Sequence, residues 1–149
     1  MRTAPTTDDL LKLDNQLCFA VYSTSLAMTR LYKLLEKLHL TYPQYLVMLA
    51  LWERDGLMVS ELGTQLSLDS GTLTPLLKRL EANGLVTRLR DVADERRVHI
   101  TLTPAGRKLK AKAASVPGCL LAASQCSISE LMGLTQQLHT LRDRLKAAA

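Results

Sequence analysis

The stretch from Val59 to Thr103 constrains the fold most strongly, because two helical patterns and an alternating pattern follow one another within it. Residues 59–66 carry apolar side chains four apart, with Ser60 as the expected capping residue, and predict a short helix with one buried stripe. After a three-residue turn, a second helix is expected from Ser70 to a left-handed stop at Asn83-Gly84. Its apolar face consists of Leu73, Leu76, Leu77 and Leu80. Together the two segments predict a helix–turn–helix unit.

The opposite face of the second helix is polar, with small hydroxyls near the N-terminus and cations further along. These side chains are Ser70, Thr72, Thr74, Lys78 and Arg79. Short hydroxyl side chains can approach base edges in a DNA major groove, and cations can bind phosphates. An ordinary solvated helix shows a similar face, so this pattern alone leaves both interpretations open.

The next residues favour the DNA interpretation. Residues 85–90 and 98–103 alternate between apolar and polar side chains around a polar tip, which predicts a β-hairpin. Its arginines are Arg88, Arg90, Arg96 and Arg97. A helix–turn–helix followed by an arginine-bearing hairpin predicts a winged helix, in which the hairpin (the wing) reaches a minor groove.

Composition agrees with a duplex-DNA partner. With 149 residues the chain can bury one core, and 19 Lys and Arg against 14 Asp and Glu leave a net charge of +5, which permits nucleic-acid binding without requiring it. One Trp and one Phe argue against stacking on unpaired bases. No apolar run approaches the roughly 20 residues that span a bilayer, and the N-terminus lacks a signal-peptide core, so we expect no membrane contact and a cytoplasmic location.

Long helices are expected on both sides of this head. The first runs from about Asp8 or Asp14 to Leu38, and Thr41 caps a shorter helix that braces the head. The apolar stripe of the first helix is Leu17, Val21, Met28, Leu31, Leu35 and Leu38. Such a stripe extends over more turns than one compact head needs, and it implies a partner helix.

On the C-terminal side, Thr103-Pro104 opens a basic helix, which Pro117-Gly118 breaks or kinks. A further helical run follows and includes two cysteines, and Ser127 with Glu130 forms a capping box for a last helix. The last helix carries a heptad-like seam of Leu131, Leu134, Leu138, Leu141 and Leu145.

These patterns predict a mainly α fold with a small β-wing, in one domain over residues 1–149. Residues 41–103 form the winged helix-turn-helix head, and residues 8–40 and 104–149 are dimerisation helices. A homodimer would bury both terminal seams and place two heads on successive grooves of a pseudo-palindromic double-stranded operator. An intramolecular hairpin of the terminal helices is the alternative.

The wing residues resemble the MarR family of regulators. Residues Asp94 to Thr103 fit that family's wing pattern of Asp, any residue, Arg, and apolar alternation into Leu-Thr. The resemblance implies that Arg96 enters the minor groove, that Asp94 steadies the wing, and that the recognition helix runs from Ser70 to Arg79.

The region from Leu13 to Trp52 resembles the OhrR branch of this family, the sensors of organic hydroperoxides. The resemblance implies that Cys18 is the redox-reactive residue and that Tyr32 and Tyr42 hydrogen-bond its sulfur. Two phenolic donors favour a thiolate, the species that attacks an O–O bond. Leu34 stands where the family has a proline, in a linker one residue shorter, which predicts an extended helix and a shifted Tyr42.

Helix geometry predicts that this site is shared between two chains. Fourteen residues separate Cys18 from Tyr32, about 21 Å along a straight helix, so Tyr32 and Tyr42 have to come from the partner. A cysteine on an apolar helix is otherwise usually a small packing residue.

Two-cysteine members of the branch close a disulfide between subunits, which implies that Cys126 or Cys119 is the resolving residue here. They are seven apart, on one face of a helix, and the usual resolving position falls near Ala122 between them. We favour Cys126, and capping of oxidised Cys18 by a small-molecule thiol is the alternative.

The leading hypothesis is therefore a DNA-binding repressor that senses an organic hydroperoxide inducer through Cys18 and releases its operator. Three alternatives remain open: a MarR-type regulator released by a small phenolic ligand, a thiol peroxidase, and a purely architectural DNA binder. The chain shows no paired carboxylates, metal-ligand spacing or glycine-rich phosphate loop, so we expect no enzyme activity, no metal and no cofactor.

Overall fold

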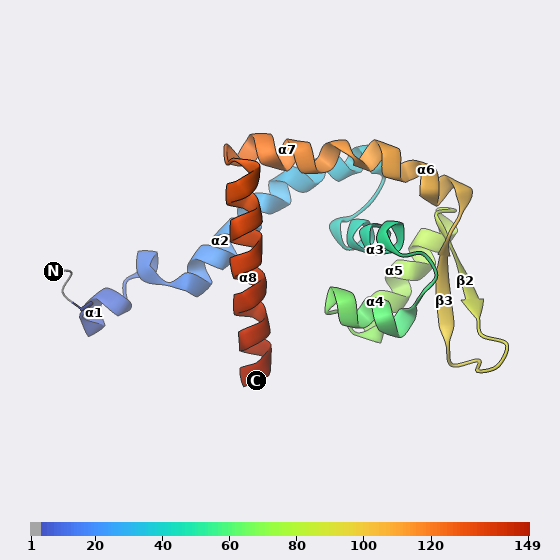
Figure 1. The fold of residues 1–149 in the computed structure, drawn as a ribbon, viewed down its shortest axis with the longest axis horizontal. Helices are drawn as coiled ribbons and strands as arrows, with labels where there is room; N and C mark the ends of the chain where they lie inside the picture. Colours follow the sequence, from blue (N-terminus) through green and yellow to red (C-terminus); the bar gives the residue numbers. More distant parts are fainter. Residues whose placement is uncertain (1–3) are drawn as a thin grey trace.

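The computed structural model describes residues 4–149, so the first three residues of the expected domain lie outside the described part. Figure 1 shows a winged head on one side, terminal helices on the other, and α6 and α7 running between them. The elements in chain order are α1 (Thr7–Leu10), η1 (Leu13–Asn15), α2 (Leu17–Thr29), η2 (Arg30–Leu38), α3 (Tyr42–Glu53), β1 (Leu57–Met58), α4 (Val59–Leu66), α5 (Ser70–Ala82), β2 (Val86–Arg90), β3 (Val98–Leu102), α6 (Pro104–Ala113), α7 (Ser115–Ser124) and α8 (Ile128–Ala148). The expected mainly α fold with a small β-wing is confirmed.

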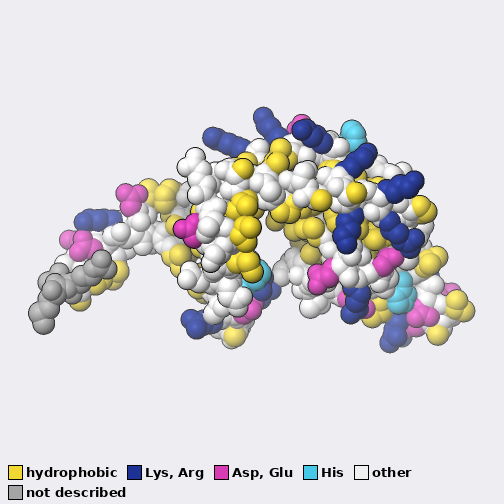
Figure 2. All heavy atoms as spheres, turned by 45° about the horizontal axis from the view of Figure 1, so that its top comes forward, with side chains coloured by type: hydrophobic (Ala, Val, Ile, Leu, Met, Phe, Trp, Pro, Cys, Tyr) yellow, Lys and Arg dark blue, Asp and Glu magenta, His cyan; other side chains and the backbone are white. Residues whose placement is uncertain are grey.

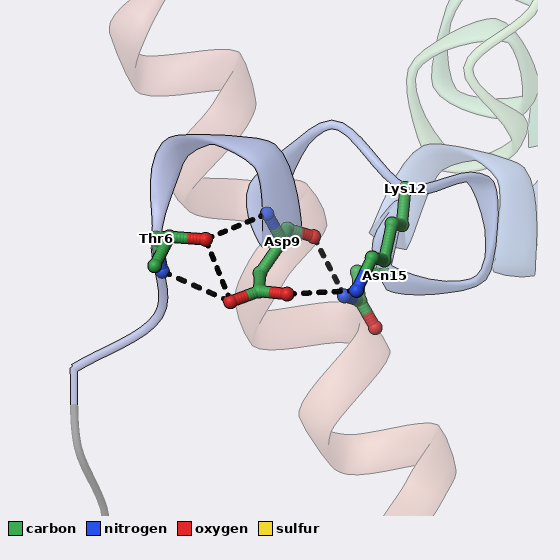
Figure 3. A network of polar contacts seen from close by, with 4 residues as sticks. All are labelled: Thr6, Asp9, Lys12 and Asn15. Carbon is green, nitrogen blue, oxygen red and sulfur yellow. Dashed lines mark hydrogen bonds and ion pairs between the residues drawn. The ribbon is translucent and has the colours of Figure 1, made fainter.

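The expected first helix does end at Leu38, but it begins at Leu17 rather than at Asp8 or Asp14, and it is α-helical only as far as Thr29. Thr6 and Asp9 form their own capping box around α1, and the Asp9 carboxylate also lies 2.8 Å from Lys12 Nζ (Figure 3). Asn15 Nδ2 donates to the carbonyl of Asp9, and Gln16 is extended (ψ 114°). These local hydrogen bonds end the chain's helical course before α2 begins at Leu17.

The second half of this segment is a 3-10 helix, η2. The helical course continues unbroken through Leu34 to Leu38 and ends at His39, whose φ of 54° is left-handed. Leu34 therefore lies inside the helical segment and does not end it. Leu35 and Leu38 are buried against the head, whereas Leu17 at the other end is 57% exposed.

The head packs three helices on a small sheet. Leu62, Leu73, Leu77 and Leu80, together with Ile100, are almost inaccessible to solvent and form the centre of the core. The sheet has the strand order β1-β3-β2, in which Leu57 pairs with Ile100 and Val86 pairs with Leu102.

The first strand was not anticipated, and it changes how α4 begins. Met58, the last residue of β1, is the N-cap of α4 and makes no side-chain capping bond, so the predicted Ser60 cap is wrong. Pairing with β3 fixes the chain direction here, and Ser60 lies inside the first turn. The other predicted caps are confirmed: Thr41 Oγ1 accepts from Gln44 N–H, and Thr103 Oγ1 from Gly106 N–H.

On the C-terminal side, the break between α6 and α7 falls at Ala114, before Pro117 rather than at Pro117-Gly118. Pro117 occupies the first turn of α7, where a missing N–H costs little. Cys126 lies beyond α7, directly after left-handed Gln125 and before α8, so the expectation that Cys119 and Cys126 share a helical face is wrong.

The last helix, α8, begins at the predicted capping box of Ser127 and Glu130. It crosses α2 in Figure 1 and points back beside the head. Near its C-terminus, Lys146 Nζ donates to Ser67 Oγ at 2.7 Å, in the turn between α4 and α5. No helix in residues 4–149 is long and apolar enough to cross a membrane.

Candidate functional site

The polar face of α5 is turned away from the core of the head. Four of the five side chains expected there, those of Ser70, Thr72, Lys78 and Arg79, are exposed, and Thr74 is half-buried. The helix starts at Asp69, whose Oδ1 accepts from Thr72 N–H at 2.7 Å. This backbone hydrogen bond is the main cause that holds the pKa of Asp69 below its usual value.

Asp94 organises the loop between β2 and β3. Its Oδ1 accepts from Arg96 N–H at 3.1 Å and from Arg96 Nε–H at 3.2 Å, and its Oδ2 lies 3.9 Å from Arg97 Nε. The two arginine side chains remain 92% and 62% exposed. Asp94 therefore holds the loop while both guanidinium groups stay open to a partner.

A groove of about 710 Å³ separates the recognition helix from the wing. Its polar lining comes from α4, α5 and the wing, through Ser60, Thr64, Ser70, Thr74, Glu81, Arg88, Arg90, Arg96 and Arg97. Arg90 was placed on the hairpin from the sequence but not among the DNA-contacting residues. Its spacing of two from Arg88 puts both on one face of β2 and could have identified it.

The part of the head from residue 61 to residue 97 has no excess of positive charge. Residues 61–97 contain the cations Lys78, Arg79, Arg88, Arg90, Arg96 and Arg97 and the carboxylates Glu61, Asp69, Glu81, Asp91, Asp94 and Glu95. The formal charges cancel, so long-range attraction to a polyanion is weak here. Any affinity of this face for DNA has to come from where individual cations are held.

Three tyrosines and the tryptophan form a continuous row of rings. Tyr32 and Tyr42 stack with centroids 4.1 Å apart and planes within 6°. Tyr45 follows at 6.5 Å from Tyr42, and Trp52 at 6.5 Å from Tyr45. Burial first, and then the neighbouring Tyr42, raises the pKa of Tyr32 above its usual value. Like any tyrosine phenol, it is protonated at neutral pH and can donate a hydrogen bond.

The tyrosine pair lies at a cavity of about 220 Å³ between η2, α3 and α7. Besides the three tyrosines, its lining is apolar and comprises Met28, Leu31, Leu34, Leu35, Val116, Pro117 and Leu120. The cavity thus has three tyrosine side chains on an otherwise apolar wall. It can therefore accept a small apolar group that carries one polar end.

Cys18 lies elsewhere in the chain. It is the second residue of α2, is exposed, and lines a groove of about 890 Å³ between α2 and α8. That groove includes neither Tyr32 nor Tyr42, and the tyrosine cavity does not include Cys18. A single chain thus keeps the predicted thiol and its predicted donors apart.

The other two cysteines are half-buried and unbonded to each other. Cys119 lies in α7, and Cys126 Sγ is 3.5 Å from the carbonyl oxygen of Ser124. All three cysteines of the chain are free thiols in this structure. In residues 4–149, no group of three or more His, Cys, Asp or Glu side chains could hold a metal ion.

The terminal helices expose their apolar faces. None of the residues of α2 or α8 is buried, and Figure 2 shows hydrophobic side chains in a band along α8. The large exposed apolar side chains of these two helices are Leu17, Phe19, Val21, Tyr22, Leu26, Met28, Ile128, Met132, Leu134, Leu138 and Leu145. A surface of this extent and continuity is typical of an interface.

Comparisons with known proteins agree with this geometry. A family model described as "Transcriptional regulator SarA/Rot" matches residues 30–113. The organic hydroperoxide resistance transcriptional regulator of Bacillus subtilis (strain 168) is 53% identical over 138 residues, 92% of this chain and 94% of that protein. Reduced AbfR bound to DNA is 35% identical, with a TM-score of 0.77 over 94% of this chain and 99% of that chain. Disulfide-formed AbfR is 38% identical, with a TM-score of 0.67 over 90% and 95%; AbfR comes from Staphylococcus epidermidis.

A helix–turn–helix whose second helix faces a groove closed by a two-stranded wing defines a winged-helix transcriptional regulator. Outside the head, the terminal helices α2 and α8 expose apolar faces. The chain belongs to the MarR family, in the branch that includes the organic hydroperoxide resistance regulator of B. subtilis.

Proposed function

We propose that the chain is a homodimeric repressor that binds double-stranded operator DNA and releases it when an organic hydroperoxide oxidises Cys18. The observation that carries this proposal is the parallel pair of phenols, Tyr32 on Tyr42, at an apolar cavity in a chain whose own reactive thiol lies elsewhere. The B. subtilis relative is named an organic hydroperoxide resistance transcriptional regulator, which supports an organic hydroperoxide as the inducer.

Dimerisation supplies the missing half of the site. Residues 8–40 and 104–149 form the dimerisation region, because their helices expose apolar faces that one chain cannot cover. When two copies pack these helices together, Cys18 of one protomer meets Tyr32 and Tyr42 of its partner. The same packing sets the two heads, residues 41–103, at the spacing of two half-sites in a pseudo-palindromic operator.

The chemistry of sensing is a two-electron oxidation of sulfur. The Cys18 thiolate attacks the distal oxygen of the hydroperoxide, the O–O bond breaks, and the products are a sulfenic acid and an alkoxide that takes up a proton to become an alcohol. The two phenols stabilise the thiolate beforehand through their O–H groups. A second thiol then condenses with the sulfenic acid, forming a disulfide and releasing water; Cys126, Cys119 or a small-molecule thiol fills this role.

DNA recognition uses the groove and the wing. Ser70, Thr72 and Thr74 approach base edges, and Arg96 enters the minor groove with Asp94 fixing its backbone. Phosphate contacts come from the remaining cations, namely Lys78, Arg79, Arg88 and Arg97. The fold of the chain is closer to reduced AbfR bound to DNA, with a TM-score of 0.77, than to disulfide-formed AbfR, with a TM-score of 0.67, which supports assigning the structure to the form without the disulfide.

A chain of contacts joins the tyrosines to the base of the wing. Tyr45 touches Tyr42 on one side and Trp52 on the other, and Trp52 Nε1 donates to the Gly106 carbonyl at 2.9 Å. Gly106 in turn packs on the Leu85 carbonyl, immediately before β2. Displacement of the phenols by an oxidised sulfur therefore has a physical route to the wing.

Each thiol is consumed once in this scheme, so the protein is a regulator and not an enzyme. It acts where its operator is, in the cytoplasm. A second candidate function is release by a small phenolic ligand, which the tyrosine-lined cavity of about 220 Å³ favours. The two functions differ in their dependence on the thiol.

The test measures affinity for operator DNA with and without cumene hydroperoxide, in wild type and in Cys18→Ser. We expect the oxidant to release DNA from the wild type and to leave the Cys18→Ser complex intact. Cys119→Ser and Cys126→Ser preserve the first oxidation step, and loss of release in one of them alone would identify the thiol that resolves the sulfenic acid. Release of DNA from Cys18→Ser by the hydroperoxide would exclude the thiol mechanism.

A further inference from the structure

Glu81 occupies a position that helix electrostatics disfavours. It is the second-last residue of α5, where the backbone carbonyls present partial negative charge and a carboxylate is destabilising. A residue that breaks a local rule often has a compensating task. Here its Oε2 accepts a hydrogen bond from the backbone N–H of Arg88 at 3.0 Å.

This bond joins the recognition helix to the free edge of the wing. The strand order β1-β3-β2 leaves β2 with one hydrogen-bonded neighbour, and Arg88 pairs with Ile100 on that side. Its N–H points to the open side, where an unpaired group would otherwise need water. Glu81 satisfies this N–H and so fixes the distance between α5 and the middle of β2.

The same carboxylate also controls the side chain of Arg88. Glu81 Oε1 lies 3.6 Å from Arg88 Nε, which is buried and has no hydrogen-bond partner. The Arg88 side chain is only 30% exposed, against 92% for Arg96 and 62% for Arg97. Among these three arginines Arg88 is therefore the most constrained, and it lines the groove between α5 and the wing.

We propose that Glu81 is a positioning residue for DNA binding, which holds Arg88 in the groove so that its guanidinium meets a phosphate of the operator backbone. The inference rests on the proposed function, and it adds a carboxylate that never touches DNA. It follows from the charge balance of residues 61–97: since their formal charges cancel, the placement of each cation decides the affinity. A preorganised arginine loses less side-chain entropy when it binds a phosphate.

A purely electrostatic role for Glu81 predicts the opposite sign. Removal of any carboxylate near DNA lowers repulsion and tightens binding. Glu95, an exposed glutamate in the wing loop, measures that effect alone, since no hydrogen bond or ion pair of its side chain is found in residues 4–149. Glu81→Gln and Glu95→Gln remove the same charge and differ in whether the ion pair with the Arg88 side chain is lost.

The experiment titrates operator DNA with full-length wild type, Glu81→Gln, Glu95→Gln, Arg88→Ala and the Glu81→Gln/Arg88→Ala double variant, at several salt concentrations. We expect Glu81→Gln to bind about tenfold more weakly, since a hydrogen-bonded contact to a charged group is at stake, and Glu95→Gln to bind as tightly as wild type or tighter. The plot of log K against log salt has a negative slope, and Arg88→Ala should make this slope less steep by about one unit.

The double variant isolates the coupling. If Glu81 acts through Arg88, then Glu81→Gln has no further weakening effect once Arg88 is alanine. Equal weakening in both backgrounds, or tighter binding of Glu81→Gln than of wild type, would overturn the inference. Thermal unfolding of each variant checks that the head remains folded. A salt dependence left unchanged by Arg88→Ala would also contradict the inference, since Arg88 would then make no phosphate contact.

The outcomes separate this inference from the proposed function. Wild-type protein that binds no operator, or that ignores hydroperoxide, refutes the proposed function whatever the Glu81 variant does. Wild-type protein that binds and responds, with a Glu81→Gln variant of equal affinity, refutes only the positioning role.

Discussion

The contact between α6 and the base of the wing leaves no room for a side chain at Gly106. A Cβ atom at this residue would lie 2.1 Å from the carbonyl oxygen of Leu85 and 3.3 Å from Leu102 Cδ2. The Leu85 carbonyl cannot turn aside easily, because it accepts a hydrogen bond from Thr103 N–H at 3.1 Å. Gly106→Ala therefore forces the backbone of α6 away from β2.

The size of the effect follows from the distances. Since an ordinary contact begins at about 3.4 Å, the two backbones have to separate by roughly 1.3 Å. Overpacking of this kind costs about 1–3 kcal/mol of folding free energy. The displacement also strains the hydrogen bond from Trp52 Nε1 to the Gly106 carbonyl. For a chain of this length, the loss corresponds to a fall in Tm of about 2–12 °C.

The assay is thermal unfolding followed by circular dichroism, with Gly118→Ala as the control. Gly118 lies inside α7 and has no atom within 4 Å of an added Cβ, so the same substitution should stabilise the chain by about 0.5–1 kcal/mol through helix propensity. Gly106→Ala with a Tm equal to or above that of wild type would refute the reasoning, since the close approach would then not constrain α6.

Three further predictions concern the core, the aromatic row and the cap of α5. Leu77→Ala, at a side chain that is 1% exposed, should cost about 2–5 kcal/mol in denaturant unfolding, whereas a loss below 1 kcal/mol would show that the core collapses around the gap. Trp52→Phe removes the donor to the α6 carbonyl and should cost about 1 kcal/mol, which denaturant midpoints can detect; an unchanged midpoint would contradict this assignment. The pKa of Asp69 is lowered in the folded state, so its contribution is present above the unfolded value of about 4 and is lost as pH falls through the folded value. The difference in Tm between wild type and Asp69→Asn should therefore shrink in acid, and a difference independent of pH would argue against an ionised cap.

Local signals in the sequence predicted much of the head. Three kinds of local signal were confirmed. Gly84 is left-handed after α5, and Thr41 and Thr103 cap the helices that follow them. The leucines spaced along α5, namely Leu73, Leu77 and Leu80, are buried. Such signals depend on backbone geometry over a few residues. They are therefore readable without a tertiary structure.

Features that depend on distant partners were missed. The two-residue strand β1 exists because Leu57 pairs with Ile100, more than forty residues away, and this pairing displaced the predicted cap from Ser60 to Met58. The break after Asn15 arises from side chains of Asn15 and Gln16 that bind carbonyls six residues back. Periodicity cannot register such bonds, since it reports only which face of a helix is apolar.

The candidate thiol site has one part that lies within a single chain and one part that needs a second chain. The stacking of Tyr32 on Tyr42 within one chain follows from the turn at His39 and Leu40, which returns α3 to η2. The position of this tyrosine pair relative to Cys18 involves two chains. Helix length alone predicts that Cys18 and the tyrosines of one chain are far apart.

Heterodimers test most directly the claim that the thiol of one protomer is activated by the phenols of the other. One protomer carries Cys18→Ser with intact tyrosines, the other carries Tyr32→Phe and Tyr42→Phe with intact Cys18, and two different affinity tags isolate the mixed dimer. Mass spectrometry then follows oxidation of the single remaining Cys18 by cumene hydroperoxide. The account predicts that this one Cys18 is oxidised at the rate of a wild-type Cys18, because it faces intact tyrosines of its partner. Oxidation as slow as in the Tyr32→Phe/Tyr42→Phe homodimer would contradict it.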